Sequence, residues 1–322
     1  MITARPRGLR RARLRLRRAA VATLNVAGRR FGYDLVARDV YSPIPRVAPD
    51  GDPWASRASL VGVDFDLHAQ LEFFDSALVR YFAEFDPPHT RVQDGEFYLW
   101  NGYYQAGDAQ VLYAMIRHLK PRRLLELGSG FSTLVSAAAC AANAREGRPC
   151  RFVAVDPEPR IPLRPGPFVE IERREAQTLP LERFMELGPG DMLFVDSSHT
   201  VKLGSEVNML ILEVLPRLRH GVVVHFHDIF LPFEYPRAWF ERGTHLSEQY
   251  LLHAFLLGNP GYEVRLAVHA LCREHPEHMV RAIPSVQAPE EHYSSAFWLV
   301  RRSVSASEPS YGRHDADRAP AA

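Results

Sequence analysis

Short apolar runs alternate with segments of helical periodicity from residue 122 onward, and this alternation constrains the fold most. Apolar runs bounded by turn residues are typical of strands buried on both faces, and helices between such strands produce a parallel sheet. The pattern predicts an α/β domain. Its strands are expected at Arg123–Leu127, Phe152–Val155, Phe168–Ile171, Met192–Val195, Val222–Phe226, Tyr262–Val268 and Ala296–Val300.

The predicted helices come from apolar residues spaced three and four apart. They are expected at 66–85, 108–119, 134–142, 207–215 and 246–257. The Pro- and His-rich segment 270–292 shows no clear helix between the last two strands. The sheet is therefore expected to end in an antiparallel pair.

Charge divides the chain unevenly. Its 322 residues carry a net charge of +1, yet the first 30 residues hold ten Arg and no Asp or Glu. The rest of the chain is acidic, which argues against specific nucleic-acid binding by the body. We expect a solvated or partly helical basic arm at 1–30; the alternative is that this arm contacts an anionic surface. The arm is followed by a helical extension at 31–118, the main domain at 119–302 and a disordered tail at 303–322.

Two further features bear on the compartment. The three cysteines, Cys140, Cys150 and Cys272, form no CxxC pair, so a disulfide framework or a structural zinc site is not expected. No apolar run approaches the ~20 residues that span a bilayer. A reducing, cytoplasmic location is the expectation. The high Arg, Ala and Pro content is typical of a high-GC bacterial gene.

A glycine-rich turn follows the first predicted strand. The sequence Glu126-Leu-Gly-Ser-Gly-Phe-Ser-Thr133 lies between that strand and the next helix. Glycines at this place let a ligand approach the backbone at the carboxyl edge of the sheet. The third small position of the dinucleotide pattern is Thr133 here, so a bound pyrophosphate is not favoured.

Polar residues end three other strands. Asp156 follows the second strand, Asp196 the fourth, and His227-Asp228 the fifth. An acidic residue after the second strand can accept hydrogen bonds from ribose hydroxyls. A single Asp after a strand is usually a turn former, but this combination with the glycine turn favours a nucleoside-containing cofactor.

These segments resemble class I S-adenosylmethionine (SAM)-dependent methyltransferases, over about Tyr98 to Val300. The likeness is to a bacterial branch with D-x-x-H and H-D-I segments, which includes sugar and macrolide O-methyltransferases and cephalosporin-hydroxylase-like proteins. It is carried by Leu124–Thr133, Val153–Pro157, Phe194–His199 and Gly221–Ile229. The first glycine of that branch's G-G-x-x-x-x-H-D-I pattern is not matched.

The resemblance implies a Rossmann-like sheet of seven strands whose last strand is antiparallel, covered by helices on both faces. It also implies a SAM site. Glu126, Gly128, Ser129 and Gly130 would surround the methionine half, and Asp156 with Pro157 would lie at the ribose. Ala176 and Gln177 would lie against the adenine, and the aromatic segment Phe97–Tyr104 would close over the cofactor.

Methyl transfer to a hydroxyl needs orientation and a base. Asp196, His199 and His227 are the candidate catalytic residues, with His225 interpreted as a core histidine. Asp196, His227 and Asp228 are also the candidate ligands of a divalent cation, as the matching positions are in related sugar O-methyltransferases. Those relatives often carry a carboxylate where His227 stands, which shifts the preference toward a softer metal or no metal.

The leading hypothesis is therefore O-methylation of a small-molecule or glycan acceptor. A metal-dependent oxygenase on the same scaffold is one alternative, using Asp196, His199 and His227 as a two-His-one-carboxylate set. A non-catalytic SAM-binding protein, docked through its Arg-rich arm, is the other.

Overall fold

The computed structural model describes residues 19–36, 42–47, 52–163, 169–286 and 293–303. The chain divides into two compact units, Met1–Asp52 and Pro53–Ala322. Residues 1–18 of the predicted basic arm and 304–322 of the predicted tail lie outside the described residues. The predicted boundaries at 30, 118 and 302 remain predictions.

The first unit is a short helix with a return turn. Residues 19–28 are helical, and η1 (Arg29–Phe31) follows them. Gly32 ends this turn in the left-handed region, with φ at 77°. The chain then runs back, and the Asn25 side chain hydrogen-bonds both backbone groups of Leu35. Most side chains here are exposed, including Leu24, Val26 and Phe31.

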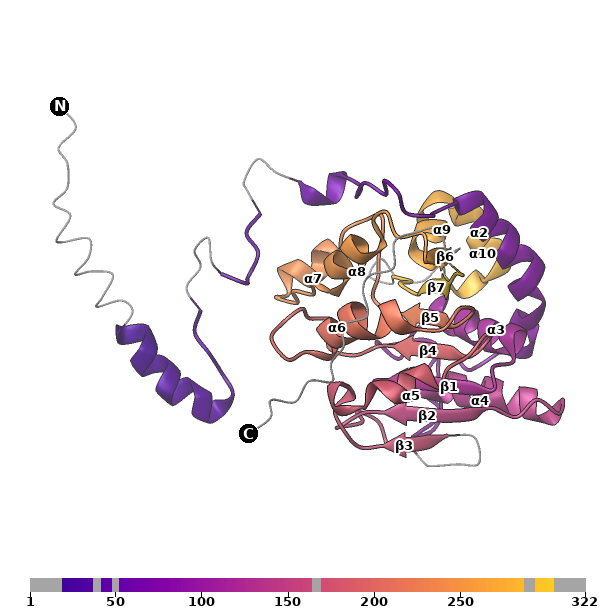
Figure 1. Cartoon of the computed structure of the whole chain (residues 1–322), viewed down its shortest axis with the longest axis horizontal. Coiled ribbons are helices and arrows are strands. Elements are labelled where there is room, and N and C mark those ends of the chain that lie inside the picture. Colours follow the sequence, from indigo (N-terminus) through magenta and orange to yellow (C-terminus); the bar gives the residue numbers. More distant parts are fainter. Residues whose placement is uncertain (1–18, 37–41, 48–51, 164–168, 287–292, 304–322) are drawn as a thin grey trace, which may run out of the picture. The chain divides into compact units, whose positions relative to one another are not determined.

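The second unit is built on a seven-stranded sheet (Figure 1). Its order is β3-β2-β1-β4-β5-β7-β6. The strands up to β5 are parallel, while β7 is antiparallel to both β5 and β6. Their bounds are β1 Arg123–Leu127, β2 Arg151–Val155, β3 Glu170–Glu172, β4 Met192–Val195, β5 Val223–Phe226, β6 Tyr262–Ala267 and β7 Phe297–Arg301. This confirms the predicted Rossmann-like fold.

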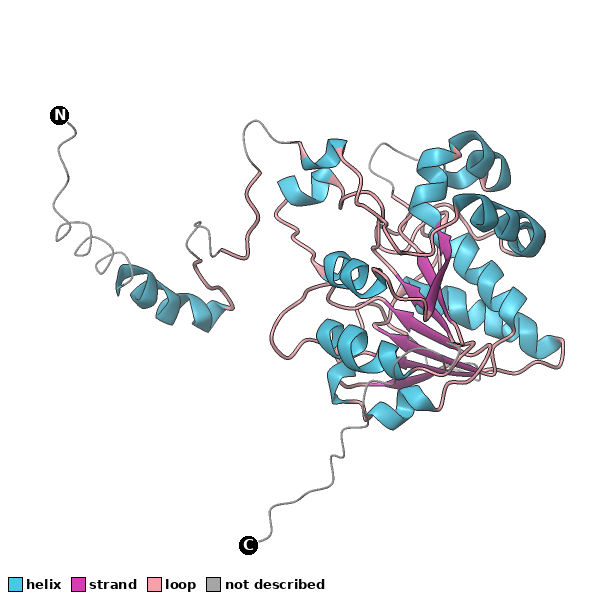
Figure 2. Ribbon diagram, turned by 45° about the horizontal axis from the view of Figure 1, so that its top comes forward, coloured by secondary structure: helices cyan, strands magenta, loops and turns pink. Residues whose placement is uncertain are grey.

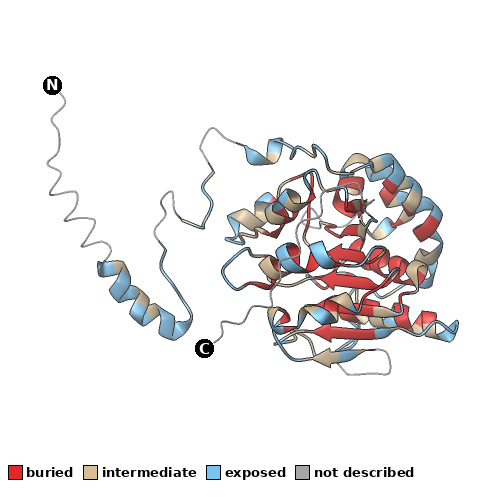
Figure 3. Ribbon diagram, in the orientation of Figure 1, coloured by how far each residue is buried: buried red, intermediate tan, exposed pale blue. Residues whose placement is uncertain are grey.

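Helices lie on both sides of the strands, and the central strands β1, β2, β4 and β5 are almost wholly buried, whereas β3 at the edge is partly exposed (Figures 2 and 3). The sheet has a hydrophobic core on each face. Successive side chains of a strand point to opposite faces, so neighbouring residues of one strand pack in different cores. Leu125 packs in a core with α5 (Leu181–Met185), α6 (Glu206–Met209) and α8 (Glu248–Leu256). Leu124 packs in the other core with α3 (Asp108–Leu119) and α4 (Phe131–Arg145). Apart from two helices described below, the remaining helices of this unit are α2 Leu67–Phe73, η3 Phe74–Leu78, η4 Val79–Glu84, η5 Ala176–Thr178, η6 Leu210–Val214, η7 Leu215–Arg217 and α7 Arg237–Glu241, with η2 Pro53–Ala55 and η8 Pro284–Val286.

One prediction was wrong. The segment expected to lack a helix contains α9 (Val268–Glu274) and α10 (Pro276–Ala282). Pro276 occupies the first turn of α10, where a missing N–H costs nothing. Leu271 on α9 and Met279 on α10 are fully buried, so each helix packs an apolar face into the core. Proline was therefore a start signal here rather than a breaker.

The predicted helix over 66–85 is divided into α2, the π-helical η3 and the 3₁₀-helical η4. Its register still buries Phe74 and Leu78 as the periodicity indicated. The helix at 108–119 is confirmed with the bounds of α3. All three cysteines are free thiols. Among the described residues, no helix is long and apolar enough to cross a membrane.

Candidate active site

The glycine loop, Gly128–Gly130, connects β1 to α4 at the carboxyl edge of the sheet. Gly128 has a φ of 87°, and a Cβ added to it would overlap the carbonyl oxygen of Asp196. Only glycine fits this approach of β1 to β4. Gly130 is different, because its backbone is extended and a Cβ there would meet no atom within 4 Å. The space in front of Gly130 is open.

Asp156 holds the glycine loop from the end of β2. Its Oδ2 accepts hydrogen bonds from the backbone N–H and the hydroxyl of Ser129, each at 2.8 Å. Its Oδ1 accepts the Glu158 N–H at 2.8 Å. Pro157 is exposed in the turn that follows. The structure thus brings Ser129 and Asp156 together, and their contact with a cofactor stays a prediction.

Glu126 lies beneath the loop rather than on its surface. The side chain is fully buried on β1, and its Oε1 accepts hydrogen bonds from Ser132 at 2.7 Å and Thr133 at 3.0 Å. Its Oε2 has no partner among the described residues. Burial raises the pKa of this carboxyl to about 8. Glu126 therefore supports the first turn of α4, and a role toward a ligand stays a prediction.

The other predicted cofactor residues border this edge. Ala176 and Gln177 lie in η5, after β3; Ala176 is buried, and the Gln177 amide donates to Glu175. In the segment Phe97–Tyr104, the ring of Tyr98 packs 5.3 Å from Phe131, the residue that follows Gly130. The Tyr103 ring lies 6.2 Å from Phe131. This aromatic segment thus adjoins the glycine loop.

Four side chains form an acid–histidine cluster at the ends of β4 and β5: Asp196, His199, His227 and Asp228. His199 Nε2 lies 3.2 Å from Asp196 Oδ1 and 3.6 Å from Asp228 Oδ2. His227 Nδ1 lies 3.6 Å from Asp196 Oδ1 and 3.4 Å from Asp228 Oδ1. The two histidines thus face the same pair of carboxylates, and all the predicted catalytic residues come together.

Two further carboxylates hold the histidines from behind, and sequence reasoning missed both. Asp108, the first residue of α3, lies 3.2 Å from His227 Nε2 through its Oδ2. Glu248, the first residue of α8, lies 2.8 Å from His199 Nδ1 through its Oε2. Both carboxylates are buried. Each histidine therefore lies between an outer carboxylate and the Asp196–Asp228 pair.

This surrounding charge controls the pKa values. Burial by itself lowers the pKa of His199 and of His227, but the neighbouring carboxylates outweigh it, and both pKa values lie well above the ordinary range. Burial raises the pKa of Asp196, yet the two histidines outweigh that effect and lower it. The cluster is thus a set of ion pairs between two buried histidines and two partly exposed carboxylates.

His225 behaves as the predicted core histidine. It is stacked between Phe194, at 4.4 Å, and Trp298, at 4.2 Å, and its Nε2 lies 3.0 Å from the Tyr104 hydroxyl. Burial lowers the pKa of His225 to about 3. This histidine is neutral and satisfied.

The backbone is strained at two positions of the cluster. His199 and Asp228 have φ values of 54° and 56°, in the left-handed region that residues other than glycine rarely adopt. Such strain persists where surrounding structure fixes it, and it concentrates at functional sites. Here the Glu248 contact holds His199, and the Ser295 hydroxyl donates to Asp228 Oδ1 at 3.0 Å.

The cluster has the donors of a cation site. One ligand atom from each of Asp196, His227 and Asp228 lies within 4.8 Å of the others. Ligands about 2.1 Å from a common ion lie about 3.0–3.5 Å apart, close to the spacing of the His227 and carboxylate atoms. Two carboxylate oxygens and one imidazole nitrogen fit a divalent cation.

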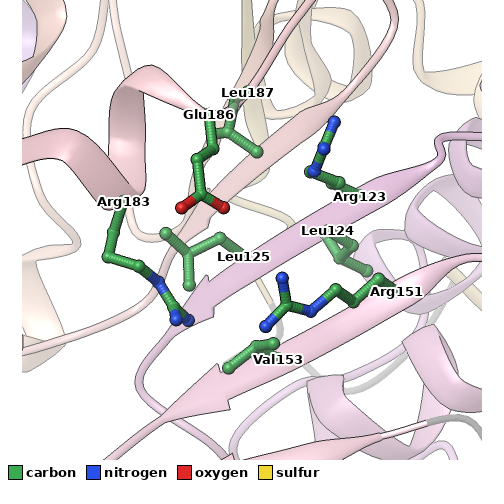
Figure 4. Close-up of a pocket in the computed structure, with 8 residues that line it drawn as sticks. All are labelled: Arg123, Leu124, Leu125, Arg151, Val153, Arg183, Glu186 and Leu187. Atoms are coloured by element: carbon green, nitrogen blue, oxygen red, sulfur yellow. The ribbon is translucent and has the colours of Figure 1, made fainter.

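A small pocket lies at the opposite edge of the sheet (Figure 4). Arg123 and Arg151, the first residues of β1 and β2, line it together with Arg183 and Glu186. The amino ends of parallel strands are not where open α/β sheets bind ligands. This pocket has no part in the candidate site.

Comparison with known proteins gives a match to a family model. A family model described as a methyltransferase domain matches residues 125–229. An uncharacterised protein of Archaeoglobus fulgidus is 31% identical over 111 residues, which cover 30% of this chain and 47% of that protein. The chain thus spans about half the length of the curated relative that it matches.

Solved structures with a related arrangement include "cmcI-N160 SAH", 16% identical, covering 70% of this chain and 91% of that chain with a TM-score of 0.38. An O-methyltransferase from Bacillus cereus in complex with SAH is 13% identical and covers 73% of this chain and 91% of that chain, with a TM-score of 0.35. Neither likeness decides the activity. The family match is more informative, because residues 125–229 contain the glycine loop, Asp156 and the acid–histidine cluster, and this region is similar to a methyltransferase domain.

Proposed function

We propose that this protein is a SAM-dependent methyltransferase that methylates a hydroxyl group of a small molecule or a sugar. The observation that carries the proposal is the contact between Gly128 and Asp196. It joins the glycine loop, where the cofactor would bind, to the acid–histidine cluster, where an acceptor hydroxyl would lose its proton.

The chemistry of methyl transfer determines what the cofactor supplies and what the protein must do. SAM brings the methyl group and its leaving group, so the protein needs to bind, to orient and to remove a proton. The open space at Gly130 and the Ser129–Asp156 pair suit the cofactor side. His199 and His227 suit the acceptor side, because each imidazole presents one nitrogen to the partly exposed Asp196.

A divalent cation fits the set of Asp196, His227 and Asp228. When bound, such a cation lowers the pKa of a coordinated hydroxyl. Asp196 and Asp228 would hold it through carboxylate oxygens and His227 through Nδ1. The oxygenase alternative needs Asp196, His199 and His227 as ligands, whereas the three ligand atoms that group together include only one histidine. This favours the methyltransferase.

Cofactor binding can be tested with a matched pair of variants. Gly130→Ala fills the open space in front of the loop, while Gly188→Ala adds the same methyl group where it meets only Asp191, at 3.8 Å. We expect Gly130→Ala to weaken SAM binding at least about tenfold, or ~1.4 kcal/mol, and Gly188→Ala to leave it unchanged. Calorimetry measures both.

Activity needs a second experiment. Labelled SAM is incubated with the protein and a library of hydroxylated small molecules and glycosides, and labelled products are identified by mass spectrometry. Transfer of the label to an acceptor oxygen is the expected result. SAM binding without any transfer would favour the non-catalytic alternative, and no SAM binding at all would refute the proposal.

A further inference from the structure

Asp108 is an anchored carboxylate behind the candidate site. Its Oδ1 accepts backbone hydrogen bonds from Ser295, at 3.1 Å, and Ala296, at 3.0 Å. Its Oδ2 also lies 2.8 Å from the Ser295 N–H. The side chain is buried at the start of α3, so these amides fix its position.

The anchored carboxylate determines how His227 is oriented. Asp108 Oδ2 lies 3.2 Å from Nε2 of His227, and a carboxylate can only accept there, so Nε2 is a donor and Nδ1 is the nitrogen that would bind a cation in place of its own proton. The Tyr104 ring lies against the imidazole, with 4.6 Å between centroids, and restricts its rotation. The remaining nitrogen, Nδ1, faces Asp196 and Asp228 at 3.6 and 3.4 Å.

We propose that Asp108 is a positioning residue, which fixes His227 with Nδ1 toward the Asp196–Asp228 pair and thereby makes the site select nitrogen-preferring cations such as Fe²⁺, Co²⁺ or Zn²⁺ over Mg²⁺. This inference rests on the proposed function, because it takes the cluster as the cation site of that activity. Imidazole suits these transition metals, whereas Mg²⁺ prefers oxygen ligands.

The physical basis is the carboxylate–histidine–metal arrangement. A carboxylate that accepts the second N–H of a histidine fixes the tautomer and makes the free nitrogen a stronger ligand. Removing such a carboxylate typically reduces metal affinity about 10- to 100-fold. Removing Asp108 should therefore weaken the binding of cations that coordinate the His227 nitrogen. The binding of Mg²⁺, which the carboxylate oxygens would mainly hold, should change little.

Glu248 supplies a matched control. It is also a buried carboxylate that contacts a histidine, at 2.8 Å from His199 Nδ1. The set of three ligand atoms contains His227 but not His199. Glu248→Gln therefore removes the same kind of contact without touching the nitrogen ligand.

The experiment uses the full chain, stripped of metal, and titrates Co²⁺ and Mg²⁺ separately by calorimetry, with the visible absorption of Co²⁺ as a second readout. We expect the wild type to bind Co²⁺ at least about 30-fold more tightly than Mg²⁺. Asp108→Asn should weaken Co²⁺ binding about 10- to 100-fold and alter its spectrum, with a change of less than about threefold for Mg²⁺. Glu248→Gln should keep the wild-type ratio of affinities within about threefold.

A double-mutant cycle excludes a merely structural effect, since Asp108 also joins α3 to the start of β7. In a His227→Gln background, Asp108→Asn should reduce Co²⁺ affinity by less than about twofold, because the nitrogen through which it acts is gone. The same loss in both backgrounds would overturn the inference. So would a wild type that prefers Mg²⁺, or an Asp108→Asn protein with the wild-type ratio.

Failure here is distinguishable from failure of the proposed function. SAM binding measured in EDTA does not depend on the cation site. A protein that binds SAM and transfers methyl groups but binds neither Co²⁺ nor Mg²⁺ overturns this inference alone. A protein that binds Co²⁺ as expected but never SAM refutes the methyltransferase and leaves the cation site standing.

Discussion

The main chain of Gly128 lies directly against the carbonyl group of Asp196, so the turn after β1 and the end of β4 meet without room for a side chain. In a sheet whose order reverses at β1, these two strand ends border the crevice where ligands bind. The contact fixes the distance between the two halves of the candidate site.

The two glycines of the loop should respond differently to alanine. Gly128→Ala combines a positive φ with an overlap on backbone, and we expect it to reduce the free energy of unfolding by about 3 kcal/mol or more. Gly130→Ala has neither problem and should leave the unfolding free energy within about 0.5 kcal/mol. Urea denaturation measures both. Equal stability of the two variants would contradict the Gly128–Asp196 contact.

Asp156 should contribute to cofactor affinity. Asp156→Ala removes the acceptor of two Ser129 hydrogen bonds and the group expected at the ribose. We expect SAM to bind more weakly by about 1–3 kcal/mol, the range for hydrogen bonds to charged groups. Glu158→Ala, two residues along the same turn, is the control and should bind normally. Unchanged affinity in Asp156→Ala would remove Asp156 from the cofactor site.

Asp196→Asn and His227→Ala should each reduce turnover by about 10²–10⁴, the usual range for general acid–base groups. SAM affinity should change little, because the proposed function assigns both residues to the acceptor side. His253→Ala, at a partly buried histidine on α8 whose Nε2 lies 2.8 Å from the Ser59 carbonyl oxygen, should turn over normally. Loss of activity in EDTA that a divalent cation restores would identify coordination. Full activity in EDTA would indicate catalysis by the cluster's own side chains without a cation, and near wild-type turnover in both variants would place the chemistry elsewhere.

Glu126 should make stability depend on pH. Its pKa of about 8 lies above the ordinary value of 4.5 for an unfolded chain. Between these values the unfolded state releases a proton that the folded state keeps, so stability falls as pH rises, by at most about 1.4 kcal/mol per pH unit. Glu126→Gln should show a smaller decline than the wild type, because the raised pKa values of His199 and His227 cause a decline of their own, while Glu158→Gln on the surface should keep the full decline. Urea unfolding at pH 5 and pH 8 gives the comparison.

Removing residues 1–30 should leave the second unit intact. The chain divides after Asp52, and none of the described residues 19–36 belongs to either core. The truncated protein should keep its melting temperature within about 2 °C and its SAM affinity unchanged. A larger loss would mean that the arm packs on the body, and lost affinity alone would connect it to the cofactor site.

The sequence was most informative where burial determined the pattern. β1 and β4 have the bounds that their apolar runs predicted, because strands covered on both faces must be apolar throughout. α9 and α10 were missed, because His and Pro interrupt their pattern and only burial of residues such as Met279 reveals them. Periodicity is weak evidence in helices of seven residues.

The glycine loop, Asp156 and the acid–histidine cluster could be predicted because each follows a strand. Asp108 and Glu248 could not, since they lie 119 and 49 residues from the histidines that they contact. An acidic residue in the first turn of a helix is common for electrostatic reasons alone. Nothing local distinguishes Asp108 from that ordinary case, and the pairing exists only once α3, β5 and β7 are assembled.

The position of β7 has a consequence for synthesis. This strand is inserted between β5 and β6, and Ser295 and Ala296, just before it, supply the amides that anchor Asp108. These residues come more than 160 positions after the glycine loop in the sequence. A nascent chain can therefore form the glycine loop while Asp108 is still unanchored, and the acid–histidine cluster gains its support behind His227 only once β7 has been synthesised.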